Sequence, residues 1–184
     1  MPVPPSDLDK RFYLGLDPGE KGALAMVDGL GKCVFLKKMP ETAVGLAETV
    51  RWTRRGWLDP PSRLKMIAGI ERIDPRPTTI PNPDKTSKQK WVKRILRSTC
   101  IIYGDFLQLH MAVLACDIPI EIIGAQEWQG GLSIPPRDKS KKETTSQFKS
   151  RLACIAKDMF PNDRVINQTA DALLIAEYLR RKHA

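Results

Sequence analysis

Three acidic residues stand at the edges of apolar segments, where a purely structural role is hard to supply. Asp17 follows the apolar stretch 12–16, Glu71 follows 66–70, and Asp171 opens a run of apolar, helix-forming residues. An unpaired carboxylate in such a place costs stability. Three carboxylates brought together would also repel one another and raise their own pKa values unless a cation neutralised them. We therefore take Asp17, Glu71 and Asp171 as candidate catalytic and metal-binding residues.

The ligand chemistry of these side chains favours a hard divalent cation. Carboxylates offer oxygen only, and with His110 and His183 as its histidines and no Cys-x-x-Cys pair the chain does not suit zinc. Oxygen ligands are typical of Mg²⁺ or Mn²⁺ sites. Two such ions, about 3.5 to 4 Å apart, can activate a water molecule and stabilise the leaving 3′ oxygen in phosphodiester hydrolysis. We expect Asp17 to bridge the two ions, and the other two carboxylates to hold one ion each.

Each of these residues also has an ordinary explanation. Asp17 precedes a Pro-Gly pair and could simply initiate a turn. Glu71 could pair with Arg72 or Arg76, and Asp171 could favour the first turn of a helix through the macrodipole. The presence of all three in this order weakens these explanations.

The apolar pattern predicts the elements that must position the acidic residues. Strands are expected at 12–16, 23–27, 32–36, 66–70 and 118–123. Helices are expected at 41–55, at about 90–116, in a short segment from 124, at about 143–160, and from about 169 through 179. Short turns between the first three strands predict an antiparallel meander. Residues 74–90, rich in proline, threonine and lysine, are expected to form an exposed loop without an element of its own.

This order of elements predicts a three-layer α/β domain with a mixed sheet. Parallel neighbouring strands would bring Asp17 and Glu71 to the same edge of that sheet. The helix at about 90–116 has apolar residues on more than one face, so one face can pack on the sheet and another on a second copy of the chain. We expect residues 1–184 to form a single domain, with 1–10 a flexible leader.

Composition favours a soluble protein with a polyanionic partner. Thirty Lys and Arg against 21 Asp and Glu give a net charge of +9 and a pI near 9.5. No apolar run of about 18 residues is present, and 1–10 carries prolines and charges. We therefore expect no membrane partner and a cytoplasmic location, or the DNA-containing compartment of the host cell, rather than secretion. Cysteines 33, 100, 116 and 154 are expected to be reduced and buried.

Several short motifs follow one another along the chain. Leu-Gly-Leu-Asp-Pro-Gly at 14–19 with Gly-Ala-Leu-Ala at 22–25, then Ile70-Glu71, Tyr103-Gly104, Pro119-Ile120-Glu121, Trp128, and Ala-Asp-Ala-Leu-Leu-Ile-Ala at 170–176 make up this set. Together they resemble the motifs of the RuvC-type Holliday junction resolvases, nearest the phage and chloroplast branch. The resemblance extends from about residue 12 to about residue 181.

The resemblance implies an RNase H-like three-layer fold, a five-stranded mixed sheet with helices on both faces, a homodimer, a divalent metal, and paired symmetric nicking of four-way DNA junctions. The family usually carries a fourth ligand, acidic or histidine, three or four residues before the terminal carboxylate. Here those positions are Asn167 and Gln168, which we include as candidate metal ligands because an amide oxygen can ligate a hard cation without adding charge. The family's junction-wedging residue after the second acidic motif is often aromatic, whereas Ile73 and Asp74 are not.

Two basic segments are candidates for DNA contact. The first contains Lys85, Lys88, Lys90, Trp91, Lys93 and Arg94, and the second contains Arg137, Lys139, Lys141 and Lys142. Solvated loops are the commoner explanation of such runs, but both flank elements that should border the carboxylates, and the tryptophan offers a stacking surface. A third group contains Arg51, Trp52, Arg54, Arg55 and Trp57. For at least one of its tryptophans, packing against the sheet is the better explanation.

Together the residues and the resemblance predict a homodimeric, Mg²⁺-dependent endodeoxyribonuclease that resolves four-way junctions. Another RNase H-like nuclease, acting on flaps or RNA/DNA hybrids, is the nearest alternative enzyme. A non-catalytic, structure-specific DNA-binding protein is an alternative of a different class, made plausible by the missing fourth acidic ligand. An actin-like or sugar-kinase phosphate-binding domain has less support, because no second phosphate loop is apparent and the chain is short for two lobes.

Overall fold

A five-stranded mixed sheet runs through the middle of the molecule in the order β3-β2-β1-β4-β7. Its strands are β1 (Arg11–Asp17), β2 (Ala23–Asp28), β3 (Cys33–Lys38), β4 (Lys65–Glu71) and β7 (Ile120–Ile123). β1, β2 and β3 pair antiparallel in sequence order, and β4 lies parallel to both β1 and β7. The predicted meander and the predicted mixed sheet are confirmed.

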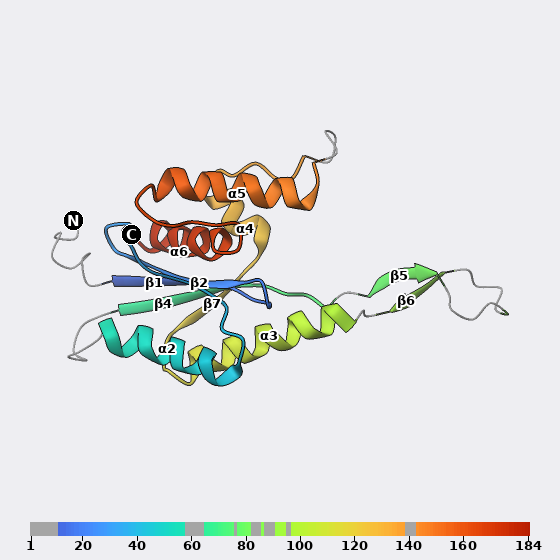
Figure 1. The fold of residues 1–184 in the computed structure, drawn as a ribbon, viewed down its shortest axis with the longest axis horizontal. Coiled ribbons are helices and arrows are strands. Elements are labelled where there is room, and N and C mark those ends of the chain that lie inside the picture. The colour runs from blue at the N-terminus through green and yellow to red at the C-terminus, as the bar shows by residue number, and fades with distance from the viewer. Residues whose placement is uncertain are drawn as a thin grey trace.

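Helices cover both faces of this sheet, as Figure 1 shows. α4 (Ala125–Gly131), α5 (Thr145–Met159) and α6 (Ala170–His183) lie on one face, and α2 (Ala43–Trp57) and α3 (Arg97–Leu114) lie on the other. The computed structural model describes residues 11–57, 65–75, 77–81, 86, 91–94, 97–138 and 143–184. The leader expected at 1–10 lies outside this range.

The core is divided between the two faces of the sheet, and β1 contributes to both halves. Tyr13 packs in the cluster formed with α4, α5 and α6, whereas Leu14 and Leu16 pack in the cluster formed with α2 and α3. A strand covered on both faces needs apolar side chains in both directions. This explains why β1 is a continuous apolar stretch ending at a single acidic residue.

The segment after β4 differs from the prediction of a loop without an element. β5 (Thr78–Pro81) pairs antiparallel with β6 (Trp91–Arg94), and this two-stranded hairpin extends away from the body beside the start of α3 (Figure 1). The prediction was wrong because the segment lacks the apolar alternation of a half-buried strand, whereas a ladder far from the core does not need it. Because β6 occupies the residues where this helix was expected to start, α3 begins at Arg97 and not near residue 90.

α3 shows the two apolar faces expected from its sequence. Phe106, Leu109 and Val113 point into the core. On the other side, Leu107, Met111 and Leu114 are exposed, while Ile101 and Ile102, also exposed, line the pocket beside Asp17. α3 therefore presents an apolar surface that nothing within the described residues covers.

The four cysteines all lie in the described part of the chain and are unpaired, as expected, but none is buried. Cys100 and Cys154 are exposed, and Cys33 and Cys116 are partly exposed. The expectation of buried thiols was therefore wrong, because Cys100 and Cys154 lie on helix surfaces, whereas Cys33 on the edge strand β3 and Cys116 in the turn after α3 only border the core. Within the described residues, no helix has both the length and the apolar character needed to cross a membrane.

Candidate metal centre

Asp17 is the last residue of β1 and is followed by a tight turn. The amide of Gly22 donates to the carbonyl of Gly19 at 2.9 Å. Gly19 has a φ of 111°, which L side chains rarely adopt. A Cβ at Gly22 would come within 2.0 Å of the carbonyl oxygen of Asp17. The two glycines thus permit the turn that fixes the backbone carrying the Asp17 side chain.

Glu71 ends β4, the parallel neighbour of β1. In the register of these strands Leu16 lies beside Ile70, so the following residues, Asp17 and Glu71, leave the sheet at the same edge. The carboxyl ends of parallel strands are a common place for functional side chains. The sequence predicted this juxtaposition, and the strand register produces it.

Asp171 reaches the same edge from the first turn of α6. The helix crosses β1 so closely that a Cβ at Gly15 would lie 1.9 Å from the carbonyl oxygen of Ala172 and 2.5 Å from the amide nitrogen of Ala176. Gly15 therefore allows backbone-to-backbone contact between strand and helix. This contact places Asp171, which is 3% exposed, beside the end of β1.

The three carboxylates meet in one cluster: Asp17, Glu71 and Asp171 each offer an oxygen, and these oxygens lie within 4.8 Å of one another. Asp171 Oδ1 is buried and accepts no hydrogen bond in the described structure. Buried polar atoms of this kind are rare unless a ligand or water satisfies them. An all-oxygen ligand set with one open buried oxygen fits a hard divalent cation such as Mg²⁺ or Mn²⁺.

The pKa values of two of these carboxyl groups reflect their environment. Burial raises the pKa of Asp17 from 3.8 to about 8, with Lys149 lowering it and the other two carboxylates raising it. Burial also raises the pKa of Glu71 from 4.5 to about 7; Asp171 raises it further, and Lys149 lowers it. The indole N–H of Trp128 is close enough to lower the pKa of Glu71, although its geometry falls short of a hydrogen bond. A bound cation would relieve this repulsion.

The ordinary explanations of the acidic residues find little support in these contacts. Within the described residues, Arg72 forms no ion pair with Glu71, and Arg76 lies outside them. Asp171 does open α6, as the macrodipole explanation requires. That explanation does not account for a carboxylate that is buried beside two others.

A fourth charged residue, Lys149 of α5, was not singled out from the sequence. Its ammonium bonds to Asp171 Oδ2. Burial opposes its charge, but the carboxylates of Asp171, Asp17 and Glu71 raise the pKa of Lys149 above its ordinary value. A signal was present: Lys149 begins the helical stripe that continues with the buried residues Leu152, Ala153 and Ala156. A lysine in an otherwise apolar stripe indicates a specific partner.

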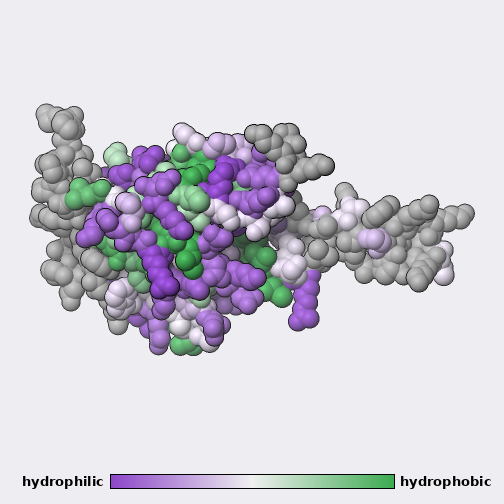
Figure 2. All heavy atoms as spheres, turned by 45° about the horizontal axis from the view of Figure 1, so that its top comes forward, coloured by the Kyte–Doolittle hydropathy of each residue, from purple (hydrophilic) through white to green (hydrophobic). Residues whose placement is uncertain are grey.

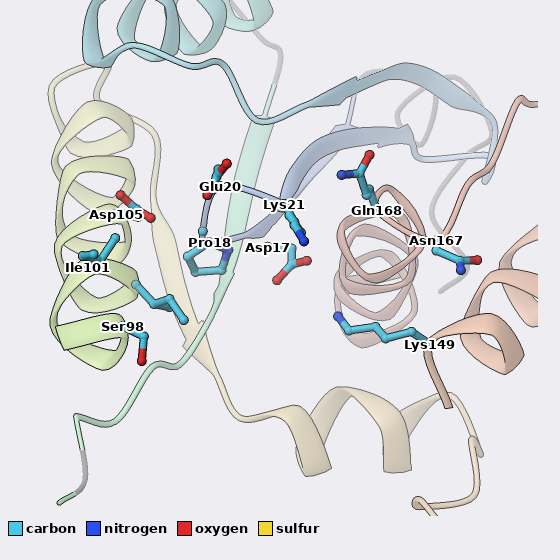
Figure 3. A pocket seen from close by; sticks show the side chains of 13 residues that line it. Asp17, Pro18, Glu20, Lys21, Ser98, Ile101, Asp105, Lys149, Asn167 and Gln168 are labelled. Atoms are coloured by element: carbon cyan, nitrogen blue, oxygen red, sulfur yellow. The ribbon is translucent and has the colours of Figure 1, made fainter. Parts of the chain in front are cut away.

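A pocket of about 530 Å³ opens beside the carboxylates, and Asp17, Lys149, Asn167 and Gln168 all line it. In Figure 3 Lys149 extends from α5 toward Asp17, and the two amides lie on the same side of the pocket. The side-chain amide of Asn167 donates to the Ser150 hydroxyl at 3.4 Å. Both residues line the pocket, and their role as metal ligands stays a prediction.

The candidate DNA-contacting residues are only partly described. Lys85, Lys88, Lys90, Lys139, Lys141 and Lys142 lie outside the described residues, and Trp91, Lys93 and Arg94 are described only through the backbone of β6. Arg137 is exposed and donates to the Thr145 hydroxyl at 2.8 Å, at the start of α5. Of the third basic group, Trp52 packs at a tilt on Phe35 yet stays 53% exposed, and Arg54 pairs with Asp117.

Two solved structures resemble this chain over nearly its whole length. The structure of RuvC from Thermus thermophilus has a TM-score of 0.52 and 14% identity and covers 93% of this chain and 96% of its own. The structure of Thermus thermophilus RuvC in complex with a Holliday junction substrate has a TM-score of 0.50 and 14% identity and covers 94% and 96%. No protein-family model matches the chain, and no curated protein sequence matches it. At this identity the likeness concerns the fold: the chain has the RNase H-like fold, a five-stranded mixed sheet with helices on both faces.

Proposed function

We propose that this chain is a metal-dependent endodeoxyribonuclease that resolves four-way DNA junctions by paired, symmetric phosphodiester hydrolysis. The observation that carries the proposal is the convergence of Asp17, Glu71 and Asp171 at one edge of an RNase H-like sheet. The likeness to a RuvC solved with a Holliday junction substrate supports a branched DNA substrate. The motif resemblance to the phage and chloroplast branch supports the same substrate.

The chemistry expected at this site needs no covalent nucleophile. A bound Mg²⁺ or Mn²⁺ supplies a Lewis acid that activates water and stabilises the charge of the leaving 3′ oxygen. The three carboxylates hold the ion, with Asp171 Oδ1 as the oxygen left open for it. Trp128, 1% exposed and close to Glu71, shields the inner side of the cluster from water and so strengthens the carboxylate–cation attraction. Substrate therefore approaches from the pocket side, past Asp17 and Lys149.

Paired cleavage requires two sites in one assembly, and α3 offers a surface for it. Leu107, Met111 and Leu114 recur at helical spacing and are 43%, 61% and 44% exposed. In the proposal this stripe packs against the same stripe of a second copy around a twofold axis. Light scattering should then give twice the chain mass, and Met111→Glu should give the monomer.

Affinity for junction DNA is expected to come from phosphate contacts made by the basic residues. The chain carries a net charge of +9, and Figure 2 shows that hydrophilic residues cover most of the described surface on the face that it displays. The candidate contacts are the first basic segment, which includes β6, and the second, which begins at Arg137. Affinity should fall steeply between low and physiological salt. Action on DNA also fits the proposed location in the cytoplasm or another DNA-containing compartment.

The deciding experiment compares three labelled substrates. Purified protein is incubated with an immobile four-way junction, a flap and an RNA/DNA hybrid, each with Mg²⁺ and with EDTA. The expected result is paired, symmetric nicks in the junction alone, dependent on Mg²⁺. Cleavage of the flap or hybrid instead would favour another RNase H-like nuclease.

Asp171→Asn serves as the control for contaminating nuclease. Tight junction binding with no cut under any condition would favour a non-catalytic DNA-binding protein, the alternative suggested by the amides at 167 and 168.

A further inference from the structure

Lys149 brings a positive charge into contact with the cluster of carboxylates. Its ammonium bonds to Asp171 Oδ2, and its charge acts on Asp17 and Glu71 as well. Lys21 also lines the pocket, but it does not contribute to the shift in the pKa of Asp17, whereas Lys149 lowers that pKa. Lys149 is thus the cation that the described structure couples to all three carboxylates.

The position of Lys149 is fixed by the helix that carries it. α5 begins with a capping box, in which the Thr144 hydroxyl accepts from the amide of Gln147 and the Gln147 side chain accepts from the amide of Thr144. Leu152 and Ala153 anchor the next turn in the core on the α6 side. Because the helix fixes the backbone of Lys149, its pairing with Asp171 costs less conformational entropy than the pairing of a lysine on a loop would.

Asp171 divides its two oxygens between different partners. Oδ2 binds the ammonium, whereas Oδ1 is buried and open. One carboxylate can therefore hold Lys149 and still offer an oxygen to a cation. If Lys149 served only to neutralise Asp171, nothing would explain why Oδ1 is left buried without a hydrogen-bond partner.

The formal charge of the site matches one divalent cation. With all three carboxyl groups ionised, as ligands of a cation are, three carboxylates and one ammonium leave two net negative charges, which a single Mg²⁺ or Mn²⁺ neutralises. A second ion would face the ammonium at short range with no fourth carboxylate in the cluster, because Asn167 and Gln168 are neutral and the pocket-lining residues Glu20 and Asp105 lie outside the cluster. Two separate features of the chain therefore act against a second ion.

We propose that Lys149 takes the place of the second metal ion, so that the site works with one divalent cation and one ammonium. This inference depends on the proposed nuclease function and replaces the expectation of two ions. Hydrolysis forms a bond from the water oxygen to phosphorus and breaks the bond from phosphorus to the 3′ oxygen. The water gives up a proton to solvent and the leaving oxygen takes one from solvent. Lys149 keeps its own protons and stabilises the developing negative charge.

The test measures how many ions bind, which does not depend on activity. Titration of the metal-free protein with Mn²⁺ in a calorimeter should give one ion per chain for the wild type and for Lys149→Arg. Lys149→Gln should bind a second ion at least about tenfold more tightly than the wild type, because a neighbouring positive charge is removed. Lys157→Gln, on the exposed side of the same helix, should behave as the wild type.

Cleavage provides the second readout. Lys149→Gln should cut at least about tenfold more slowly at the Mg²⁺ concentration that saturates the wild type, and should recover as Mg²⁺ is raised further. Lys149→Arg should keep most of the activity at the lower concentration. Thermal unfolding of each variant shows whether it is folded, and Lys149→Arg retains the charge should Lys149→Gln fail to fold.

The outcomes separate this inference from the proposed function. A wild type that cuts junctions and binds two Mn²⁺ ions, or a folded Lys149→Gln with unchanged ion count, would overturn the role of Lys149 and leave the nuclease standing. A wild type that binds one ion but cuts no junction would overturn the proposed junction resolution. Slower cutting by Lys149→Gln with no recovery at any Mg²⁺ concentration would also contradict replacement of an ion.

Discussion

Two buried carboxylates on α6 have opposite surroundings. Asp171 and Glu177 are 3% and 4% exposed. Glu177 accepts from Arg180 at 2.8 and 2.9 Å and from Arg181 at 2.7 Å, so both of its oxygens are satisfied. Burial opposes its ionisation, but the two arginines hold the pKa of Glu177 below its ordinary value. Asp171 has a partner on one oxygen only.

This difference shows that the open oxygen at Asp171 is not forced by the fold. The same helix, less than two turns further on, supplies two guanidinium groups to a carboxylate that is equally buried. Buried charges without full compensation are unfavourable for folding and recur at functional sites. We therefore propose that Glu177 is structural and Asp171 functional, and the following predictions test that distinction.

The largest expected effect is on cleavage. Asp17→Asn, Glu71→Gln and Asp171→Asn, made separately, should each reduce junction cleavage by at least about a thousandfold, or ~4 kcal/mol of barrier, because each removes a charged metal ligand. Junction affinity, measured by gel shift, should change little. A folded Glu177→Gln should cut within a few-fold of the wild type. A carboxylate variant that cuts at the normal rate would remove that residue from the site.

The next effect concerns stabilisation by metal. Mn²⁺ at about one hundred times its Kd should raise the free energy of unfolding of the metal-free wild type by about 2.7 kcal/mol, because the ion binds the folded chain alone. Urea unfolding with and without Mn²⁺ measures this. Glu177→Gln should keep the gain and Asp171→Asn should lose most of it. An equal gain in all three proteins would place the ion elsewhere.

A smaller effect is expected on the stability of the metal-free chain. Glu177→Gln should lower the free energy of unfolding by about 2 kcal/mol, because it leaves the partly buried Arg180 and the exposed Arg181 without their counter-charge. Asp171→Asn should change it by less than about 1 kcal/mol, since the wild-type carboxylate is itself incompletely satisfied. Equal losses in urea unfolding would contradict the distinction between the two residues.

The smallest effect is on pH dependence. The folded metal-free chain keeps protons on Asp17 and Glu71, whose pKa values are raised to about 8 and about 7, whereas the unfolded chain releases them near pH 3.8 and 4.5. This contribution to stability is therefore present below about pH 4 and is lost as the pH rises toward 8. Asp17→Asn should have a Tm about 2–4 °C above that of the wild type at pH 8 and closer to it at pH 5. If the difference in Tm between Asp17→Asn and the wild type were the same at pH 5 and pH 8, the burial of the Asp17 carboxyl group would be contradicted.

The sequence was most informative where the local pattern of apolar residues coincided with burial in the core. β1 and β4 were predictable because buried central strands are apolar throughout, and each ends at the acidic residue that breaks the pattern. The convergence of these ends followed from parallel pairing. The β5–β6 hairpin could not be predicted in this way, because its two segments lack the alternation of apolar and polar residues that marks a half-buried strand. Lys149 was overlooked because lysines in a basic chain are usually solvated, and only its place in a buried stripe sets it apart.

The contact between Gly15 and α6 makes the geometry of the site sensitive to the addition of a single methyl group. A Cβ at position 15 would lie 1.9 Å from the helix backbone, so the strand and the helix can approach this closely only because residue 15 is glycine. The distance between Asp17 on the strand and Asp171 on the helix depends on this approach. Mg²⁺ takes oxygens at about 2.0–2.1 Å and Ca²⁺ at about 2.3–2.6 Å. A single methyl group at Gly15, two residues before Asp17, would force the strand and the helix apart, so we expect Gly15→Ala to shift the preference of the proposed site from Mg²⁺ toward the larger Ca²⁺.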